Sequence, residues 1–544
     1  METKIILLIL DGFGISLKEQ GNAVSFAKTP TLDYLIENYP FSTLKAAGLA
    51  AGLSESEAGN SEVGHLILGS GRIIYQYMPR IIESIRDKSF FKNEALVKAI
   101  KNVKKHGSNL HLMGLLGTGS AHSYIDHLYG LLELARQYNL GKYTKLHIFV
   151  DGKDSAPFEG ANLIRHINIR LKETGTGEIA SVIGRLYAMD RDYNWDRTKS
   201  AFELIVKGNG LQTIDPEAAV REMYIRGFND NNMPAIVVTD KNGVPNGTVN
   251  PYDSVIFFNY REDRARQITR SFVTPNKVTF KPEVPKEIVF VGFSEYERGL
   301  PMDIAFNPPE VKECLAQVLS DSGKTQLHIA ETEKYAHITY FFNGFYESKF
   351  ENEDWILIPS FDVYNFADKP ELKTYEIIEK IINAIKENKY DFIVANIANF
   401  DLLGHTGDFG ATVKSIEYVD KLLKEIVNEV EQDEQKIMIV TGDHGNAEKM
   451  IDPFTGNKLT EHSRNNVPFI LINKNFKTTK SQVDILKEKK DPIGQIADVA
   501  PTILELFNIK KPAVMTGASL LSKLLSEEKV PKDFTQETIL STNP

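Results

Sequence analysis

Three short apolar runs each end in side chains that can bind a divalent metal ion. Short runs of this kind predict buried parallel strands, and ligands bind beyond the carboxyl ends of such strands. The pattern therefore predicts one site built at the ends of three strands. The candidate ligands are Asp11 after residues 5–10, Asp401 and His405 after residues 392–398, and Asp443 with His444 after residues 437–440.

The candidate nucleophile is Ser61, in the run GNSEVGH at residues 59–65. Its flanking glycines allow the backbone of a bend to approach a phosphate closely. The run lacks the Gly-Lys-Ser/Thr of a P-loop and does not fit the Gly-x-Ser-x-Gly pattern of hydrolases. Because a serine hydroxyl needs activation to ionise near neutral pH, this hypothesis depends on the metal ligands.

His462, in the run EHS at residues 461–463, completes a set of three aspartates and three histidines. Mixed carboxylate and imidazole ligands favour Mn²⁺, Zn²⁺ or Fe²⁺ over Ca²⁺. With a serine oxygen they are enough for two adjacent ions, which can activate an attacking oxygen and stabilise phosphoryl charge. Each residue also has an ordinary structural explanation, since Asp11 before a glycine is typical of a turn and Asp443 can simply hydrogen-bond to His444.

The middle of the chain carries arginines in loops that follow predicted strands: Arg185, Arg191, Arg261 and Arg264. In a chain of net negative charge, such arginines favour bidentate binding of a carboxylate or phosphate, although each could instead form a surface ion pair. Other polar side chains at strand ends could transfer protons there. They are Asp151 and Asp154 after residues 146–150, and His122 after residues 110–116.

The bulk composition describes an ordinary globular protein of more than one domain, with 544 residues, 42% of them hydrophobic and 25% charged. A formal charge of -10 argues against a general nucleic-acid surface. The single cysteine, Cys314, excludes an intrachain disulfide and fits a reducing compartment. Because no apolar run is long enough for a signal peptide or a membrane span, we expect a soluble, cytoplasmic protein without membrane or nucleic-acid partners.

Strand-like and helix-like stretches alternate along the whole chain, which predicts α/β architecture. The clearest examples are strands at 110–116, 146–150, 255–258, 288–291 and 469–472, and helices at 371–388 and 412–431.

The metal candidates lie near the two ends of the chain, and the arginines lie between them. This order predicts a discontinuous metal domain, residues 1–75 and 310–522, interrupted by an inserted domain, residues 76–309. A linker proline signal at residues 307–309 supports the second crossing. We expect residues 523–544 to form a tail and the lysine-rich stretch 474–490 to be a solvated surface insertion.

With these residues laid out, the chain resembles the cofactor-independent phosphoglycerate mutases of the alkaline phosphatase superfamily. The resemblance runs from residue 5 to about residue 521 and includes motifs from both predicted domains. The matching runs are GNSEVGH at 59–65, YAMDRD at 187–192, AETEKYAH at 330–337, GHTG at 404–407 and DHGNAE at 443–448.

The resemblance implies an alkaline-phosphatase-like α/β metal domain with a mainly parallel sheet and two Mn²⁺ ions, and an inserted α/β phosphotransferase domain. It assigns one ion to Asp401, His405 and His462. It assigns the other to Asp11, Asp443, His444 and the Ser61 oxygen. The implied substrate-binding residues are His122, Asp151, Lys153, Asp154, Arg185, Arg191, Arg261, Arg264 and Lys334.

The implied reaction interconverts 3-phosphoglycerate and 2-phosphoglycerate through a phosphoserine, without 2,3-bisphosphoglycerate. Ser61 would attack the phosphoryl group, Lys334 would stabilise its charge, and Asp154 would protonate the departing hydroxyl. Closure of the two domains would exclude water. The resemblance also favours a monomer. The family usually has arginine where this chain has Lys153, so the resemblance implies that a two-pronged contact is replaced by a single ammonium contact.

Two other functions compete with this one. A metal-dependent phosphomonoesterase of the same superfamily would keep the metal residues but not the motifs of the middle segment. A catalytically silent protein that binds a phosphorylated metabolite would have no chemical need for the complete set of seven metal-site residues. The motifs therefore favour the mutase.

Overall fold

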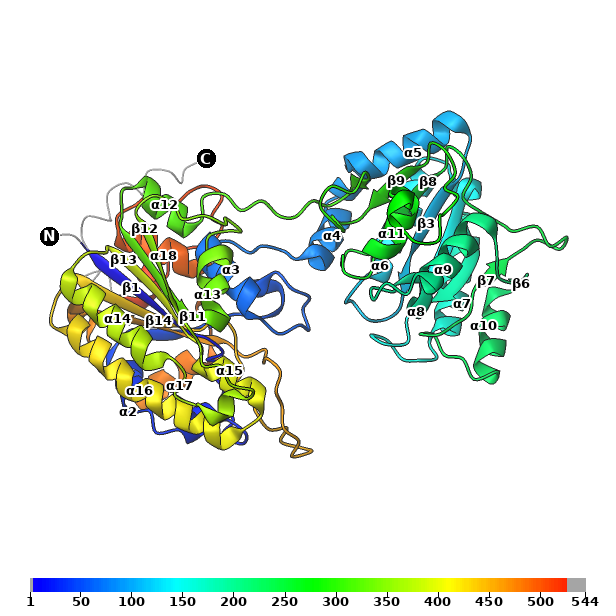
Figure 1. Ribbon diagram of the computed structural model, residues 1–544. Helices are drawn as coiled ribbons and strands as arrows, with labels where there is room; N and C mark the ends of the chain where they lie inside the picture. The colour runs from blue at the N-terminus through cyan, green and yellow to red at the C-terminus, as the bar shows by residue number, and fades with distance from the viewer. Residues whose placement is uncertain (1–2, 526–544) are drawn as a thin grey trace. The chain divides into compact units, whose positions relative to one another are not determined.

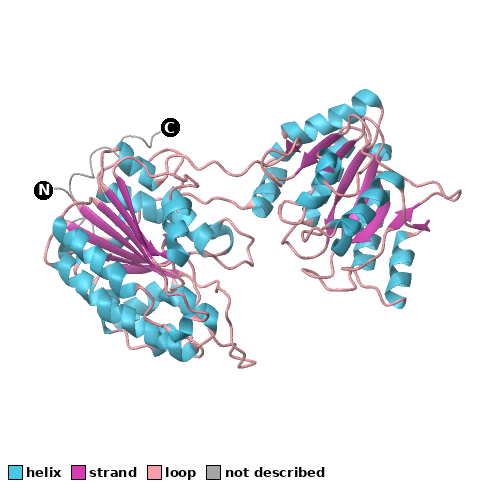
Figure 2. Cartoon of the chain, in the orientation of Figure 1, coloured by secondary structure: helices cyan, strands magenta, loops and turns pink. Residues whose placement is uncertain are grey.

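The chain divides into two compact units, which are described separately below. Unit 1 comprises Met1–Tyr75 with Pro309–Pro544, and unit 2 comprises Gln76–Pro308. The computed structural model describes residues 3–525. Each unit contains one eight-stranded sheet with helices on both of its faces (Figures 1 and 2).

The sheet of unit 1 has the strand order β12-β11-β13-β1-β14-β15-β2-β16. Its strands from β12 to β14 are parallel, whereas β15 is antiparallel to both of its neighbours. The strands are β1 (Lys4–Leu10), β2 (Phe41–Lys45), β11 (Gln326–Glu331), β12 (Glu353–Ile358), β13 (Phe392–Ile397), β14 (Lys436–Thr441), β15 (Val467–Ile472) and β16 (Gly494–Gln495).

Helices cover both faces of this sheet. Alternate residues of the central strand β1 therefore pack into two different cores. Ile6 and Leu8 pack with helices α2 (Pro30–Asn38), α14 (Thr374–Glu387) and α16 (Phe409–Glu431). Ile5 and Leu7 pack with α3 (Ser61–Ser70), α12 (Leu315–Asp321) and α18 (Val499–Leu506). A strand that is buried on both faces needs the continuous apolar run that the sequence shows at 5–10.

The four adjacent strands β11, β13, β1 and β14 run in the same direction, so their carboxyl ends meet at one edge of the sheet. In the register of the two central pairs, Ile9 aligns with both Asn396 and Thr441. The segments that follow these strands therefore begin side by side. This register is what brings residues near 11, 334, 401 and 443 together.

The sheet of unit 2 has the order β10-β9-β8-β3-β4-β5-β7-β6 and is parallel except between β5 and β7. The strands are β3 (Leu110–Leu116), β4 (Thr144–Val150), β5 (Glu178–Gly184), β6 (Leu211–Thr213), β7 (Ile236–Val238), β8 (Ser254–Phe257), β9 (Val289–Gly292) and β10 (Asp303–Ile304).

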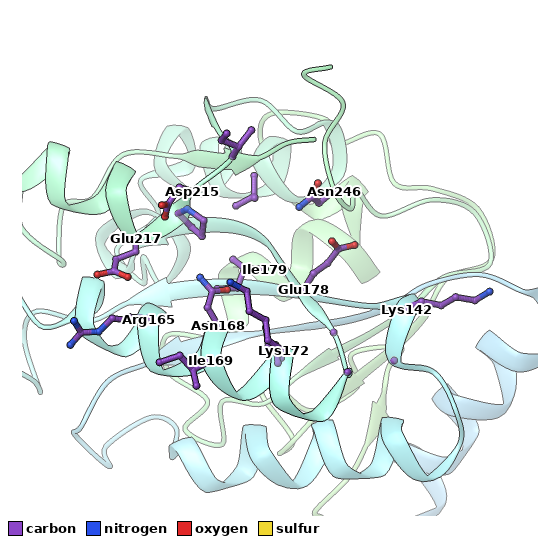
Figure 3. A pocket seen from close by; sticks show the side chains of 17 residues that line it. Lys142, Arg165, Asn168, Ile169, Lys172, Glu178, Ile179, Asp215, Glu217 and Asn246 are labelled. Atoms are coloured by element: carbon purple, nitrogen blue, oxygen red, sulfur yellow. The ribbon is translucent and has the colours of Figure 1, made fainter. Parts of the chain in front are cut away.

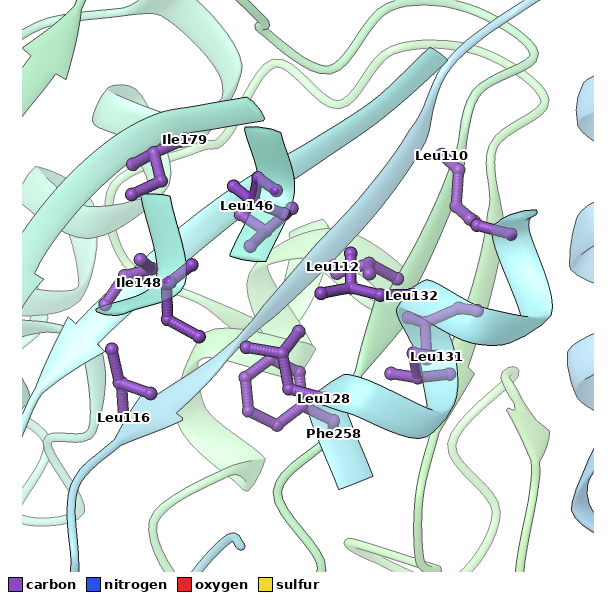
Figure 4. Packing of buried hydrophobic residues seen from close by; sticks show 14 of the residues in the cluster. Leu110, Leu112, Leu116, Leu128, Leu131, Leu132, Leu146, Ile148, Ile179 and Phe258 are labelled. Atoms are coloured by element: carbon purple, nitrogen blue, oxygen red, sulfur yellow. The ribbon is translucent and has the colours of Figure 1, made fainter. Parts of the chain in front are cut away.

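The larger core of unit 2 lies on one face of its sheet. Leucines of α6, such as Leu128 and Leu131, pack there against Leu112 of β3 and Ile148 of β4 (Figure 4). The helices on this face are α4 (Tyr77–Arg86), α5 (Glu94–His106), α6 (Ile125–Gln137), α7 (Gly160–Thr174) and α10 (Pro216–Ile225). Helices α9 (Trp195–Lys207) and α11 (Arg266–Val273) cover the other face.

The predicted elements are present, and their ends have local causes. The five predicted strands are β3, β4, β8, β9 and β15, each within two residues of the predicted ends. Helix α14 begins at Thr374 and not at 371, because Leu372 has a left-handed backbone with φ 46°. Helix α16 begins at Phe409 because the side chain of Asp408 accepts a hydrogen bond from the Ala411 N–H.

The lysine-rich stretch is mostly exposed, as predicted, and its helix α17 (Gln482–Lys490) buries Ile485 against the core. The predicted tail 523–544 begins inside α19 (Leu521–Leu524), and Leu525 is buried. Residues 526–544 lie outside the described residues. Within the described part of the chain, no helix is both long and apolar enough to cross a membrane.

Candidate active site

Ser61 is the first residue of helix α3, and not part of a free bend as predicted. The preceding residue, Asn60, caps this helix by accepting a hydrogen bond from the Val63 N–H. The Ser61 side chain is buried at the positive end of the helix, where a phosphate is electrostatically favoured. Gly64 allows the close approach of α3 to the β14 loop, because a Cβ there would lie 2.7 Å from the Asp443 carbonyl oxygen.

The first group of candidate metal ligands is Asp401, His405 and His462, whose ligand atoms lie within 4.8 Å of one another. Asp401 and His405 are four residues apart on helix α15 (Asn399–Thr406), so one helical face carries both. Asp401 Oδ1 lies 3.2 Å from His405 Nε2 and 3.1 Å from His462 Nε2.

The second group is Asp11, Asp443 and His444, which are fully buried and also lie within 4.8 Å of one another. His444 Nε2 lies 3.5 Å from Asp11 Oδ1 and 3.4 Å from Asp443 Oδ2. It also lies 4.0 Å from Asp401 Oδ1, which belongs to the first group. The two groups are therefore adjacent.

Ser61 and Lys334 lie between the two groups. Ser61 Oγ is 2.9 Å from His444 Nε2 and 3.2 Å from Asp11 Oδ1. The ammonium of Lys334, on α13 (Thr332–Ala336) after β11, donates to Ser61 Oγ at 2.8 Å, to Asp11 at 2.7 Å and to Asp401 at 2.5 Å. The predicted nucleophile and the predicted charge-stabilising lysine are therefore in direct contact.

The histidines of the first group are oriented as metal ligands. His405 Nδ1 lies 2.7 Å from the Thr460 carbonyl oxygen, and His462 Nδ1 lies 2.8 Å from the Gly59 carbonyl oxygen. A carbonyl in this position can accept the Nδ1 proton of a neutral ring, which leaves Nε2 free to bind a metal ion. The two Nε2 atoms are 3.0 Å apart beside Asp401, an arrangement that a cation stabilises.

Lys334 only partly compensates the buried negative charge. Burial lowers the pKa of its ammonium, but the charges of Asp11, Asp401 and Asp443 outweigh burial and raise that pKa above its ordinary value. Burial raises the pKa of Asp11, and the neighbouring Asp443 raises it further. Burial also raises the pKa of Asp443, but His444 and other partners hold it below the usual range. One ammonium faces three carboxylates, and this excess of negative charge fits divalent cations.

Two polar residues outside the second group contact its carboxylates: His65 contacts Asp443, and Asn396 contacts Asp11. His65 Nδ1 lies 2.8 Å from the Ser61 carbonyl oxygen and 3.2 Å from Asp443 Oδ2. Asn396 donates to Asp11 Oδ2 at 2.7 Å and lies 2.9 Å from His65 Nε2. Sequence reasoning missed Asn396. Its signal was a polar residue inside an otherwise apolar strand.

The predicted anion-binding residues gather in unit 2 at the carboxyl ends of its parallel strands. Arg185, after β5, donates to Asp151 at 2.5 Å and to Asp154 at 2.7 Å, both of which follow β4. His122 Nε2 lies 3.8 Å from Asp154 Oδ2. Burial raises the pKa of Asp154, but the hydrogen bond and charge of Arg185 hold it below the usual value. Asp154 is therefore ionised near neutral pH.

Asp263, which the sequence did not single out, joins the remaining residues of this cluster. It pairs with Arg191 at 2.6 Å and with Arg261 at 3.2 Å, and it lies 3.8 Å from His122 Nδ1. Arg264 instead donates to the Met189 carbonyl oxygen. The side chain of the last predicted residue, Lys153, is exposed and makes no ion pair with the described residues.

A large surface cavity of about 840 Å³ lies elsewhere in unit 2 (Figure 3). Lys142 and Glu178 line it at the amino ends of β4 and β5, opposite the ends that carry Asp151 and Arg185. Its acids already have partners, since Glu178 pairs with Lys145. None of the predicted site residues lines this cavity. The chemistry therefore belongs to the strand ends described above.

Comparisons with known proteins identify the family of this chain. A family model described as the metalloenzyme superfamily matches residues 3–511. A 2,3-bisphosphoglycerate-independent phosphoglycerate mutase 1 from Methanosarcina barkeri is 45% identical over 520 residues, which cover 95% of this chain and 98% of the relative. A 2,3-bisphosphoglycerate-independent phosphoglycerate mutase from Clostridium botulinum is 44% identical over 519 residues, with 95% and 99% covered.

A solved structure extends the likeness to the fold. The phosphoglycerate mutase of Leishmania mexicana, solved at low cobalt concentration, matches with a TM-score of 0.57 and 27% sequence identity. The match covers 95% of this chain and 97% of that one. The predicted fold class, α/β with mainly parallel sheets, is confirmed.

Proposed function

Because this chain belongs to the 2,3-bisphosphoglycerate-independent phosphoglycerate mutases, within the metalloenzyme superfamily, we propose that it interconverts 3-phosphoglycerate and 2-phosphoglycerate through a phosphoserine at Ser61. The observation that carries the proposal is the position of Ser61 Oγ, in contact with Asp11, His444 and Lys334. We also propose a cytoplasmic monomer, on the family resemblance alone.

The two ligand groups fit two divalent ions, and their chemistry suits Mn²⁺. Asp401, His405 and His462 would hold one ion, and Asp11, Asp443, His444 and the Ser61 oxygen would hold the other. When bound, such ions supply the positive charge that activates a hydroxyl and stabilises a transferring phosphoryl group.

In the proposed reaction, the Ser61 hydroxyl gives up its proton to solvent and its Oγ forms a bond to phosphorus. The bond from phosphorus to the glycerate oxygen breaks, and that oxygen takes a proton from Asp154. Lys334, already 2.8 Å from Ser61 Oγ, stabilises the negative charge on the phosphoryl oxygens. The second hydroxyl of the glycerate then attacks the phosphoserine and frees Ser61. This sequence needs no bisphosphorylated cofactor, because the same serine donates and accepts the group.

The residues of unit 2 suit the binding of the glycerate and the transfer of its protons. Arg185, Arg191, Arg261 and Arg264 offer guanidinium groups for the carboxylate and phosphate. In the substrate-free protein Arg185 keeps Asp154 ionised, so Asp154 can accept a proton from the attacking hydroxyl. A substrate anion that takes over Arg185 raises the pKa of Asp154, which then holds the proton for the departing oxygen.

The proposal is tested with metal-stripped protein and 3-phosphoglycerate, without added 2,3-bisphosphoglycerate. We expect no turnover after chelation, recovery on addition of Mn²⁺, and about two metal ions per chain by elemental analysis. Release of inorganic phosphate faster than formation of 2-phosphoglycerate would favour a phosphomonoesterase instead. Tight phosphoglycerate binding without any turnover in the metal-loaded protein would favour a silent binding protein.

A further inference from the structure

The candidate metal ligands are carried by segments that are far apart in the sequence, and those segments must keep a fixed spacing. Asp11 follows β1, Asp443 and His444 follow β14, and His462 lies in a loop before β15. Main-chain contacts join these segments at a few points, such as Ser463 N–H to the Gly445 carbonyl oxygen at 2.8 Å. One buried side chain makes further contacts with all three segments.

That side chain is Glu448, whose residue is 2% exposed. Its Oε2 accepts hydrogen bonds from the Gly14 N–H at 3.1 Å and from the Asn446 N–H at 2.9 Å. Its Oε1 accepts from the Ser463 hydroxyl, and from Asn465 Nδ2 at 2.9 Å. Gly14 lies in the β1 segment, Asn446 in the β14 segment, and Ser463 with Asn465 in the His462 loop.

The same network reaches the fourth ligand-bearing segment through Asn446. Asn446 Nδ2 donates to Asp401 Oδ1 at 2.9 Å. Asp401 belongs to the first ligand group and contacts His405 and His462. Glu448 thus holds the main chain of Asn446, whose side chain in turn orients a candidate ligand.

Two glycines, Gly14 and Gly445, leave the space that the Glu448 carboxylate occupies. A Cβ at Gly14 would lie 2.3 Å from the Glu448 carboxyl carbon, and a Cβ at Gly445 would lie 2.5 Å from Glu448 Oε1. Gly14 is not in the left-handed region, so its backbone alone does not require glycine. The space that glycine leaves at this position is filled by Glu448.

Glu448 is a negative charge without a cation. Among the described residues it makes no ion pair with Lys, Arg or His, and four donors satisfy its two oxygens instead. It is not in either candidate ligand group. A buried carboxylate is costly unless it is fully hydrogen-bonded. The four donors meet this condition, and because they come from three separate segments, Glu448 links those segments to one another.

We propose that Glu448 is a positioning residue, which fixes the mutual spacing of the Asp11, Asp443–His444 and His462 segments, and through Asn446 the orientation of Asp401. It acts on metal binding and not on the substrate. The proposal rests on the proposed metal ligands. Partners of this kind typically change metal affinity by 10–100-fold when they are altered.

The test measures Mn²⁺ affinity by competition with a chelator, together with the melting temperature of the metal-free protein, in Glu448→Gln and Gly14→Ala. The first variant removes the charge that accepts four donors. The second keeps the charge but displaces the carboxylate. We expect Mn²⁺ to bind at least tenfold more weakly in both variants.

Asp420→Asn is the matched control. Asp420 is equally buried in unit 1 and accepts hydrogen bonds from the Thr31 and Leu32 N–H groups, on the helix-α2 side of the unit. It should lower the metal-free melting temperature and leave Mn²⁺ affinity unchanged. If Glu448→Gln fails to fold, the Mn²⁺ affinity of Gly14→Ala is the measurement that tests the proposal.

The proposal is overturned if Gly14→Ala, or a folded Glu448→Gln, binds Mn²⁺ within threefold of the wild type. It is also overturned if Asp420→Asn loses as much affinity, because the loss would then follow from general destabilisation. A wild-type protein that binds no Mn²⁺ contradicts the proposed function itself. These failures are distinguishable.

Discussion

At the scale of single residues, Ser61 Oγ is the atom on which the proposed chemistry depends. Ser61→Ala removes the only oxygen that can carry the phosphoryl group in the proposed reaction, so turnover should fall to the background rate. Binding of 3-phosphoglycerate, measured by calorimetry, should stay within a few-fold of the wild type.

Ser70→Ala is the control for this substitution. Ser70 lies at the other end of the same helix, where its hydroxyl donates to the Arg72 carbonyl oxygen. This variant should retain its activity. Measurable turnover in Ser61→Ala would exclude the phosphoserine route.

Lys334→Met tests how the site balances its charge. The ammonium is the ion-pair partner of Asp11 and Asp401, and all three side chains are buried. Removing one member of a buried ion pair commonly costs about 3–5 kcal/mol. We expect a loss of that order in the unfolding free energy of the metal-free protein, measured with denaturant, and a smaller loss with Mn²⁺ present. An equal loss in both conditions would argue against metal in these groups.

Lys153→Arg tests the one clear departure from the family pattern. The Lys153 side chain is exposed beside the Asp151 and Arg185 cluster, where a guanidinium can make one more charged hydrogen bond than an ammonium. One such bond contributes about 1 kcal/mol, so KM should fall by about fivefold with kcat unchanged. Lys142→Arg, at the opposite end of the sheet, should change neither constant. An unchanged KM in Lys153→Arg would mean that Lys153 does not contact the substrate.

At the scale of elements, helix α6 carries a histidine that should make unit 2 sensitive to acid. His127 packs against Tyr124, Tyr260 and Phe293, and burial lowers its pKa to about 3. The unfolded chain, with a pKa near about 6.5, therefore binds a proton that the folded chain excludes. Stability should fall as the pH drops below about 6.5, by up to about 1.4 kcal/mol per pH unit.

His127→Leu should remove this component of the acid sensitivity. Neither ring nitrogen of His127 makes a well-formed hydrogen bond within the described residues, and the backbone of Met78 only weakly opposes the effect of burial on its pKa, so an apolar replacement costs little hydrogen bonding. Denaturant unfolding between pH 7 and pH 4 measures the effect. A pH dependence identical to that of the wild type would show that His127 is protonated in the folded state.

At the scale of the whole molecule, the two units have separate cores and carry different sets of the proposed site residues. All seven proposed metal-site residues lie in unit 1. Mn²⁺ should therefore slow hydrogen exchange in the segments after β1, β13 and β14, because a ligand stabilises the folded state that binds it. Exchange in the strands of unit 2 should not change. Protection of both units by Mn²⁺ alone would contradict this division of ligands.

The sequence by itself determined the α/β class and the strands, and it named the candidate residues of the site. A short, continuous apolar run such as 5–10 predicts a strand that is buried on both faces, and the polar residues directly after it are then candidate ligands. The rare motifs added the family and the residue roles. The positions of Ser61, Lys334 and the six proposed ligands within one site agree with that interpretation.

Only the tertiary structure decided how these residues meet. The adjacency of β13, β1 and β14 is a property of strand order, which no local pattern encodes. Asp263 and Asn396 gain their importance from side chains that are distant in the sequence. The sequence shows Glu448 only as the last residue of the run DHGNAE at 443–448. Its buried carboxylate has meaning only where the segments of Gly14, Asn446 and Ser463 converge, because hydrogen bonds depend on distance in space and not on separation along the chain.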